Sequence, residues 1–338
     1  MTLLTIAIPT YNGAETIRET LDSILSQTPT LNEQVYVVIS DNNSTDGTGE
    51  ILQEFNRNYQ NVMYFKNPEN IGYDRNYDLM IQKSPGEYVW TICDDDIIKP
   101  GAIRKVLDVL CKIPKLSNIF VNCSVYDGEL KKCKTKRILD IYNDDIYLTT
   151  DSFYGKTGLA TINTSGNIIS RKLWLEVDKE NAFDSYWSHF EIISRIKLHY
   201  PRYRSYCIAE PLVVIRQGDT VRWCCGDNLG CALLEKGLHL LEVVNWMKLQ
   251  GASDKCVKQL KNTIVSNLLS TIIFARISGY NTDLRMMKWM YRIVDNPVLV
   301  LGVYFPLMVI PRVFLQFPIQ IFRDIKSNNL FAITPEKS

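Results

Sequence analysis

Three adjacent carboxylates follow an apolar run in the stretch Trp90-Thr91-Ile92-Cys93-Asp94-Asp95-Asp96-Ile97-Ile98-Lys99-Pro100-Gly101. Neighbouring acids repel one another, so three in a row at the end of a buried strand point to a divalent cation that holds them. Carboxylate oxygens suit hard ions such as Mg²⁺ or Mn²⁺. Taken by itself, the stretch fits an acidic turn with solvated side chains equally well. The neighbouring segments decide between the two interpretations.

Before this stretch, short apolar runs alternate with segments of helical periodicity. Buried strands are predicted at residues 3–9, 35–39, 62–65 and 87–93, with helices between them and another helix at 102–112. This alternation predicts βαβ units, and therefore an α/β fold with parallel strands.

Polar residues follow each of the four predicted strands. They are Thr10 to Asn12, Asp41, Asn70, and Asp94 to Asp96. Ligands of such sheets bind at the carboxyl ends of the strands. Four polar strand ends that meet at one crevice are far less expected by chance than one acidic turn, so we favour a binding site.

The second half of the chain has a looser pattern. We expect strands at 119–123, 164–170 and 206–215, and helices at 171–177, 186–198, 229–247, 257–277 and 284–294. Pro211 favours an edge position for the strand that contains it. Composition changes after Arg216, and we predict one domain at 1–225 and a helical region at 226–338.

A long apolar segment at about 298–322 lies in the helical region. Pro306, Pro311, Pro318 and Arg312 interrupt it, which disfavours a transmembrane helix. A kinked segment in the membrane interface, with basic residues near anionic headgroups, fits better. The alternatives are a buried helical hairpin and the interface of a homo-oligomer.

Composition excludes several classes of protein. A net charge of +1 gives no field that favours nucleic acid. The nine cysteines include no CxxC pair, which argues against a zinc cluster and a disulfide framework and favours a reducing compartment. The first strand has no basic segment or cleavage site before it, so we expect no signal peptide. No GxGxxG follows that strand, which argues against a dehydrogenase.

Four motifs in register resemble those of family 2 glycosyltransferases, which have the GT-A fold. They are Pro9-Thr10-Tyr11-Asn12, Asp41-Asn42-Asn43-Ser44-Thr45-Asp46-Gly47, Asn70-Ile71-Gly72 with Arg75-Asn76, and Asp94-Asp95-Asp96 with Pro100-Gly101. The resemblance covers about residues 3–220 and implies a Rossmann-like mixed sheet flanked by helices. It divides the domain into a donor-binding half at 1–112 and an acceptor half at 113–225. The acceptor half and the tail are similar to bacterial O-antigen and capsule enzymes, including abequosyltransferase-like members.

The resemblance implies a site for a nucleotide-sugar donor. Asp41 accepts a hydrogen bond from the base, Tyr11 offers a flat face beside it, and Thr10 and Asn12 line the ribose. Arg75 contacts phosphate as a guanidinium, or alternatively forms a salt bridge to Asp41 or Asp94. Pro9, Asn70 and Gly72 belong to the same nucleotide-binding motifs.

The acidic triplet resembles the DxD motif of the family. Asp94 or Asp95 meets the ribose, and Asp96, together with Asp94, holds Mg²⁺ or Mn²⁺ on the pyrophosphate. The ion acts as a Lewis acid that offsets charge on the departing nucleoside diphosphate. Because the three residues are identical, the sequence does not decide which aspartate takes which role. A third metal ligand, commonly a His in the family, is not visible in the sequence.

The family usually places its catalytic base, an Asp, in a Glu-Asp pair that opens a helix. Alignment on Arg195 puts His189 at that position, which is a departure, and Glu191 lies two residues further on. As a histidine, residue 189 has an unperturbed pKa that suits a base near neutrality, whereas Glu191 would need surroundings that leave it accessible and ionised. Asp184 is a third candidate.

Two further groups of residues lie near the predicted site. Gly166 and Asn167 border the acceptor pocket in this interpretation. A loop that closes over the donor is expected at Arg216, Gln217, Arg222 and Trp223.

We therefore expect a metal-dependent glycosyltransferase of bacterial surface-polysaccharide synthesis. It takes a nucleotide-sugar donor and a lipid-linked acceptor at the cytoplasmic face of the inner membrane, which its C-terminal helices contact. A nucleotidyltransferase is the alternative enzyme, although the loop after the first strand has no basic residue for phosphate. A non-catalytic sugar-nucleotide-binding relative is the third hypothesis, because the expected acidic base is missing.

Overall fold

The computed structural model describes residues 2–29, 34–183, 187–217, 229–277 and 306. The chain divides into two compact units, with the boundary between Gln217 and Gly218. The first unit contains all the strands of the described residues, and the second contains two long helices.

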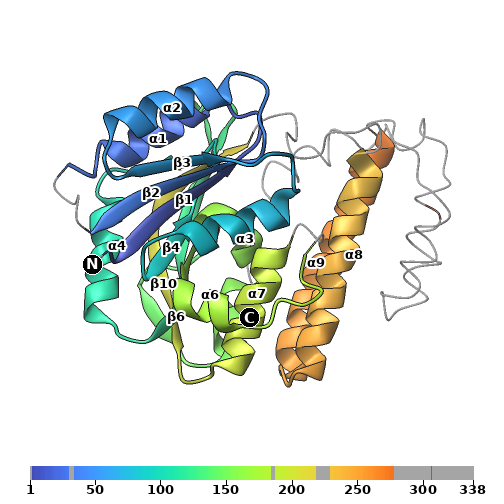
Figure 1. Ribbon diagram of the computed structural model, residues 1–338. Coiled ribbons are helices and arrows are strands. Elements are labelled where there is room, and N and C mark those ends of the chain that lie inside the picture. Colours follow the sequence, from blue (N-terminus) through green and yellow to red (C-terminus); the bar gives the residue numbers. More distant parts are fainter. Residues whose placement is uncertain (1, 30–33, 184–186, 218–228, 278–305, 307–338) are drawn as a thin grey trace. The chain divides into compact units, whose positions relative to one another are not determined.

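One mixed sheet forms the centre of the first unit (Figure 1). Its strands are β1 (Leu4–Thr10), β2 (Val35–Asp41), β3 (Val62–Lys66), β4 (Tyr88–Thr91), β5 (Ile97–Ile98), β6 (Leu116–Asp127), β7 (Cys133–Thr135), β8 (Asp145–Tyr147), β9 (Asn167–Ser170) and β10 (Arg204–Gln217). Their order is β3-β2-β1-β4-β9-β6-β10-β5, with β7 paired to β6 and β8 to β10. The first four strands are parallel, as predicted, and β9 runs antiparallel to both β4 and β6.

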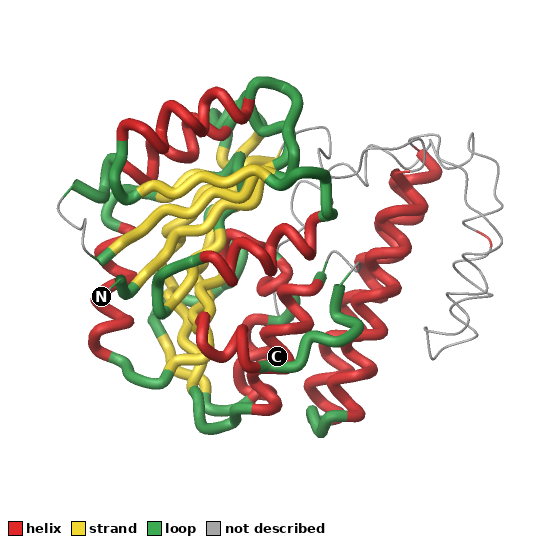
Figure 2. Tube along the Cα trace, in the orientation of Figure 1, coloured by secondary structure: helices red, strands yellow, loops and turns green. Residues whose placement is uncertain are grey.

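Helices cover both faces of this sheet (Figure 2). They are α1 (Ile17–Leu25), α2 (Thr48–Asn58), α3 (Tyr73–Lys83), α4 (Ala102–Lys112), α5 (Thr150–Thr157), α6 (Arg171–Glu176) and α7 (Ser188–His199). One buried cluster packs Tyr77 of α3, Trp174 of α6 and Ile192 of α7 against strand residues that include Ala7 and Val38. Ile6 and Ile8 alternate with Ala7 along β1 and therefore face the other side, where they are also fully buried.

The order of the strands creates a topological switch point between β1 and β4. The chain moves outward from β1 to β2 and β3, and then returns through α3 to β4 on the opposite side of β1. Right-handed crossovers in opposite directions place their helices on opposite faces of the sheet. The carboxyl ends of β1 and β4 therefore border the crevice in which sheets of this kind bind ligands.

The prediction that Pro211 marks an edge strand was wrong. β10 lies inside the sheet, between β6 on one side and β5 and β8 on the other. Proline is tolerated there because the pairing with β6 is irregular between Ile208 and Val213, so no regular ladder hydrogen bond is demanded of residue 211.

The second unit is a pair of helices, α8 (Leu229–Leu249) and α9 (Asp254–Ile277), that pack on each other. Gly251 has a φ of +96°, a left-handed conformation that glycine adopts without strain, and it turns the chain between them. Among the described residues, none of the helices has the length and apolar character that crossing a bilayer requires. The predicted helix at 284–294 and the apolar segment at 298–322, apart from Pro306, lie outside the described residues.

Candidate functional site

The loops after β1 and β4 meet at the switch point. Thr10, the last residue of β1, is 3% exposed, and its Oγ1 donates a 2.5 Å hydrogen bond to Oδ2 of Asp94. Gly13 lies directly beside this bond, and a Cβ atom at that position would overlap both Asp94 Oδ2 and Thr10 Oγ1. The close approach of the two loops therefore depends on glycine at position 13.

A second set of bonds joins the loop after β1 to the loop after β2. The backbone N–H of Asn12 donates to Ser44 Oγ at 2.9 Å, and Asn12 Oδ1 accepts from the N–H of Thr45 at 2.9 Å. Asn12 has a φ of 54°, which asparagine adopts more readily than most residues. Tyr11 stands beside it with 49% of its surface exposed. Of the predicted donor-binding residues, Tyr11 is thus an open aromatic face, and Pro9 is buried within β1.

Asp41 ends β2 and is fully buried. Its Oδ1 accepts from the N–H of Ser44 at 2.8 Å, and its Oδ2 accepts from the hydroxyl of Tyr64 at 3.2 Å. Burial, followed by the negative charge of Asp41, raises the pKa of Tyr64 to about 12, so this tyrosine remains a donor. The Asp41 carboxylate, which we expect to bind the base of the nucleotide, therefore also holds the loop after β2 in its conformation.

Four asparagines form an amide network at the ends of β2 and β3. Asn42 Nδ2 donates to Asn70 Oδ1 at 2.7 Å, and Asn67 Nδ2 donates to both Asn42 Oδ1 and Asn76 Oδ1 at 3.1 and 2.9 Å. Asn70 Oδ1 also accepts from the N–H of Gly72 at 3.0 Å, just before α3 begins. Asn70 and Gly72 therefore anchor the start of α3, in addition to their predicted part in nucleotide binding.

Arg75 is exposed on the first turn of α3. Its guanidinium lies 5.6 Å from the centre of the Phe183 ring. This distance is within the range of a cation–π contact. The predicted contact between Arg75 and phosphate stays a prediction.

The three aspartates after β4 have different surroundings. Asp94 is bonded to Thr10, whereas Asp96 is 3% exposed and its oxygens accept from Ser165 Oγ at 2.5 Å and from the N–H of Arg216 at 3.0 Å. Ligand atoms of Cys93, Asp95 and Asp96 lie within 4.8 Å of one another. The geometry therefore places Asp95 together with Asp96, and the pairing of Asp94 with Asp96 stays a prediction.

This group fits a hard divalent cation through its two carboxylates. Burial, and then the charge of Asp95, raises the pKa of Asp96 well above its usual value. Both effects disfavour the charged carboxylate, and a cation bound beside it would favour that charged form. Burial likewise raises the pKa of the Cys93 thiol well above its usual value, so Cys93 stays protonated. Oxygen donors suit Mg²⁺ or Mn²⁺, and a thiol does not.

His189 lies on the first turn of α7 and is 1% exposed. Its Nε2 is 2.8 Å from the carbonyl oxygen of Ile162, so Nε2 carries the proton and donates. Nδ1 is buried and has no hydrogen-bond partner among the described residues. Burial lowers the pKa of His189, so the ring is neutral. The structure thus encloses the residue at the usual base position.

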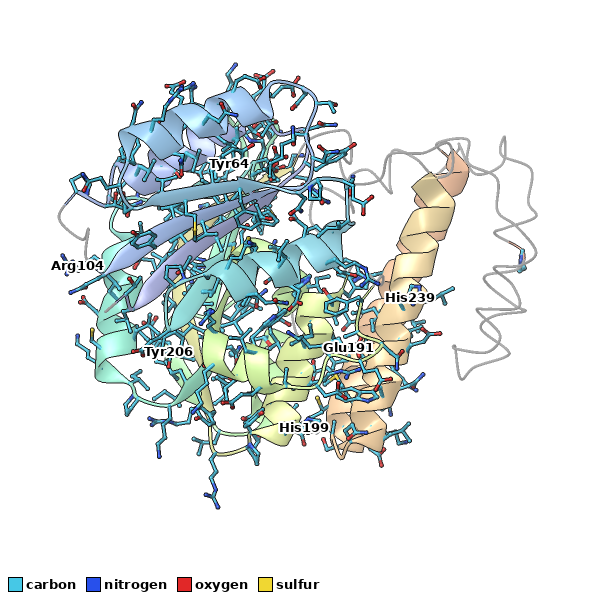
Figure 3. All side chains as sticks on the ribbon, viewed as in Figure 1. Tyr64, Arg104, Glu191, His199, Tyr206 and His239 are labelled. Atoms are coloured by element: carbon cyan, nitrogen blue, oxygen red, sulfur yellow. The ribbon has the colours of Figure 1, made fainter. Side chains whose placement is uncertain are left out.

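Glu191 lies on α7, where Figure 3 labels it, and is 7% exposed. Its Oε1 accepts from Nη2 and Nε of Arg195 at 2.6 and 3.0 Å. This ion pair joins successive turns of the helix and satisfies a buried charge. Asp184, the third candidate for the base, lies outside the described residues.

Ser165, in the 3₁₀ turn just before β9, is a site residue that sequence reasoning did not single out, and it precedes Gly166 and Asn167, the predicted border of the acceptor pocket. Ser165 bonds Asp96 and also accepts from the N–H of Cys93 at 2.9 Å. Gly166 packs so closely on Phe120 that a Cβ atom would overlap the ring. Asn167 is fully buried, and its Nδ2 donates to two backbone carbonyls of its own segment. A serine 69 residues from its partner leaves no local signal in the sequence.

Comparison with known proteins identifies the family of this chain. Residues 5–176 match the model described as Glycosyl transferase family 2. Over 102 residues the chain is 36% identical to abequosyltransferase RfbV of Salmonella typhimurium, which covers 30% of this chain and 30% of that protein. The chain thus spans about a third of the length of this relative.

Solved structures resemble nearly the whole chain. Residues 1–349 of S. aureus TarS, in complex with UDP-GlcNAc, superpose with a TM-score of 0.59 at 14% identity, covering 97% of this chain and 89% of that one. The mannosyltransferase PcManGT of Pyrobaculum calidifontis, in complex with GDP-Man and Mn²⁺, gives 0.51 at 16% identity, covering 96% and 86%. At these identities the likeness concerns the fold.

Proposed function

The chain belongs to glycosyltransferase family 2 and has the predicted GT-A fold, and from this premise we propose that it moves a sugar from a nucleotide-sugar donor to a lipid-linked saccharide in bacterial surface-polysaccharide synthesis. The observation that carries the proposal is the pairing of Asp95 and Asp96 at the switch point, beside the Thr10–Asp94 bond. A phosphate-bearing ligand and a cation are the partners that such a site fits.

The donor is proposed to lie over the loops after β1 and β2. Tyr11 offers an exposed ring, and Thr10, Asn12 and Asp41 carry the hydroxyl, amide and carboxylate groups that a nucleoside uses. UDP-GlcNAc and GDP-Man are bound by proteins of the same fold. Arg75 remains the proposed partner of the phosphates.

Asp95 and Asp96 would hold Mg²⁺ or Mn²⁺. The carboxylates are close enough to share one ion, and their repulsion is lowest when a cation lies between them. A cation bound there supplies Lewis-acid stabilisation of the departing nucleoside diphosphate. Ser165 and Arg216 keep the Asp96 carboxylate oriented, because each donates to one of its oxygens. Asp94 remains a proposed ribose or metal ligand.

The catalytic base is proposed among His189, Glu191 and Asp184. Deprotonation of the acceptor hydroxyl needs a group within hydrogen-bond reach of it. Nε2 of His189 is hydrogen-bonded to a backbone carbonyl, and Oε1 of Glu191 accepts from Arg195. As the base, His189 would therefore have to act through Nδ1, or Glu191 through Oε2.

The enclosure of His189 supports a second candidate function. A relative that binds sugar nucleotides without catalysis would have the donor site and no base. Binding of donor without product, tested against a panel of lipid-linked acceptors, would favour it over the enzyme.

The protein is proposed to act at the cytoplasmic face of the bacterial inner membrane, where a lipid-linked acceptor lies. The apolar composition of residues 298–322 and the basic residues in and just after them, Arg312, Arg323 and Lys326, support this. A homo-oligomer built on the same segment is the alternative use of its apolar surface.

Transfer assays with and without a chelator test the proposal. A thermal-shift screen of nucleotide sugars with Mn²⁺ first identifies the donor, because a ligand of the folded state raises the melting temperature. Transfer should then require Mn²⁺ or Mg²⁺ and be lost in Asp96→Ala. Full activity of that variant in EDTA would refute the metal assignment, and release of pyrophosphate would indicate a nucleotidyltransferase instead.

A further inference from the structure

Arg216 contacts the acidic loop through both its backbone and its side chain. Its N–H donates to Asp96 Oδ1 at 3.0 Å, and its Nε donates to the carbonyl oxygen of Asp95 at 2.9 Å. One residue on β10 thus fixes the carboxylate of one aspartate and the main chain of the other, although it is 120 residues away from Asp96 in the chain.

The rest of the guanidinium is also engaged. Nη1 donates to the carbonyl oxygen of Gly128 at 2.9 Å, and Nη2 forms an ion pair with Glu19 on α1. The side chain of Arg216 is only 12% exposed, whereas that of Glu19 is 58% exposed. Arg216 therefore connects α1, the acidic loop and the turn after β6 through one rigid, planar group.

The charge of Arg216 suits this position. Asp94, Asp95 and Asp96 repel one another, and Asp96 is buried, so the loop needs a cation nearby even before a metal binds. A guanidinium is permanently charged and planar, and its N–H donors point in fixed, separate directions. A lysine ammonium is a compact group that cannot donate to three acceptors so far apart.

We propose that Arg216 is a positioning residue that holds Asp95 and Asp96 in the arrangement that binds the cation. The inference rests on the proposed function, since it assigns a role toward that metal site. Groups that orient metal ligands typically contribute about 10- to 100-fold to metal affinity.

The test is Mn²⁺ affinity, measured by electron paramagnetic resonance of free Mn²⁺ in the presence of UDP or GDP, whichever raises the melting temperature of the wild type. Arg216→Gln keeps the main-chain N–H on Asp96 and removes the side-chain bond to Asp95. It should weaken Mn²⁺ binding by about tenfold or more, and Arg216→Lys should restore little of it. Arg204→Gln is the matched control, because Arg204 is on the same strand and donates to the carbonyl oxygen of Pro114 at 2.7 Å. It should bind Mn²⁺ as the wild type does.

Glu19→Gln provides a second variant that keeps Arg216 and removes only an exposed carboxylate. It should weaken Mn²⁺ binding by a smaller factor than Arg216→Gln, with an unchanged melting temperature. Wild-type Mn²⁺ affinity in Arg216→Gln would overturn the inference and leave the proposed function intact; if Arg216→Gln does not fold, wild-type affinity in Glu19→Gln would overturn it. Failure of the wild type to bind Mn²⁺ with either nucleotide would instead overturn the proposed function.

Discussion

The hydroxyl of Thr10 donates to the carboxylate of Asp94 across the switch point of the sheet, at 2.5 Å and over a separation of 84 residues. This bond joins the ends of β1 and β4, which are neighbours only because the chain reverses its direction of travel through the sheet. It holds one aspartate of the triplet, while ligand atoms of Asp95 and Asp96 lie within 4.8 Å of each other.

Replacing Thr10 with valine removes this donor and keeps the shape of the side chain. A hydrogen bond to a charged group contributes about 1.5–3 kcal/mol, so we expect the free energy of unfolding to fall by up to that amount for this partly buried bond. The rate of sugar transfer should fall by more than the loss of folded protein explains, because Asp94 can then turn away from the donor site. Chemical denaturation and kcat/KM, measured on the same preparation, check both effects. Unchanged kcat/KM would show that the orientation of Asp94 is unimportant.

Gly13→Ala should abolish activity by crowding Asp94. The added Cβ would overlap the Asp94 carboxylate and the Thr10 hydroxyl, so one of the two must move. Gly155→Ala is the control: Gly155 lies in α5, where a Cβ meets no atom within 4 Å, and alanine in a helix favours the fold by about 0.5–1 kcal/mol. Donor binding by calorimetry should be lost in the first variant and retained in the second.

The grouping of the carboxylates predicts an order of effects on metal dependence. Asp95→Asn should raise the Mn²⁺ concentration that gives half-maximal activity more than Asp94→Asn does, because the Asp95 carboxylate groups with Asp96, whereas the Asp94 carboxylate accepts a hydrogen bond from Thr10. Asp94→Asn should act mainly on the KM for the donor. The opposite order would restore the pair first predicted from the sequence, Asp94 with Asp96.

Glu191→Gln should cost stability through Arg195. Breaking a buried ion pair by removing one partner typically costs about 3–5 kcal/mol, since it leaves an unpaired charge. The double variant Glu191→Leu/Arg195→Met removes both charges and should recover much of the loss. Activity per folded molecule then distinguishes the roles: a kcat that survives in Glu191→Gln excludes Glu191 as the base and directs attention to His189 and Asp184.

Lys197 should make stability depend on pH in the alkaline range. Burial lowers the pKa of Lys197 to about 8, while its unfolded value lies near 10.5. Between these values the unfolded chain binds more protons, so the contribution of this lysine to stability rises with pH. Below pH 8 its full penalty is present, on the order of 3 kcal/mol. Lys197→Met should therefore be more stable than the wild type at neutral pH, and the difference should shrink toward pH 10.5.

Denaturation of both proteins across this pH range checks the prediction. Lys172→Met is the control, because the side chain of Lys172 is 70% exposed and its replacement should give a difference that does not vary with pH. A constant difference between Lys197→Met and the wild type would contradict the inferred shift.

Much of the first half of the fold was predictable from local pattern. The strands at β1 to β4 and the helix α4 agree with their expected positions within a few residues, because buried strands and amphipathic helices have distinct periodicities. The second half was less regular. The expected strand at 164–170 is a short 3₁₀ turn (Thr164–Gly166) followed by β9, and Ser165 in that turn reaches Asp96.

By itself, the sequence determined the family, the parallel strands and the four polar strand ends that meet at one edge, because parallel pairing brings every carboxyl end to the same side. Only the tertiary structure decided which contacts each of the candidate residues makes. Asp94 turns to Thr10, Asp96 turns to Ser165 and Arg216, and His189 is enclosed with its Nε2 on Ile162. The partners in these contacts are 27 to 120 residues apart in the chain, so no local pattern records them. Burial and hydrogen bonding, which distinguish three identical aspartates, exist only after the chain has folded.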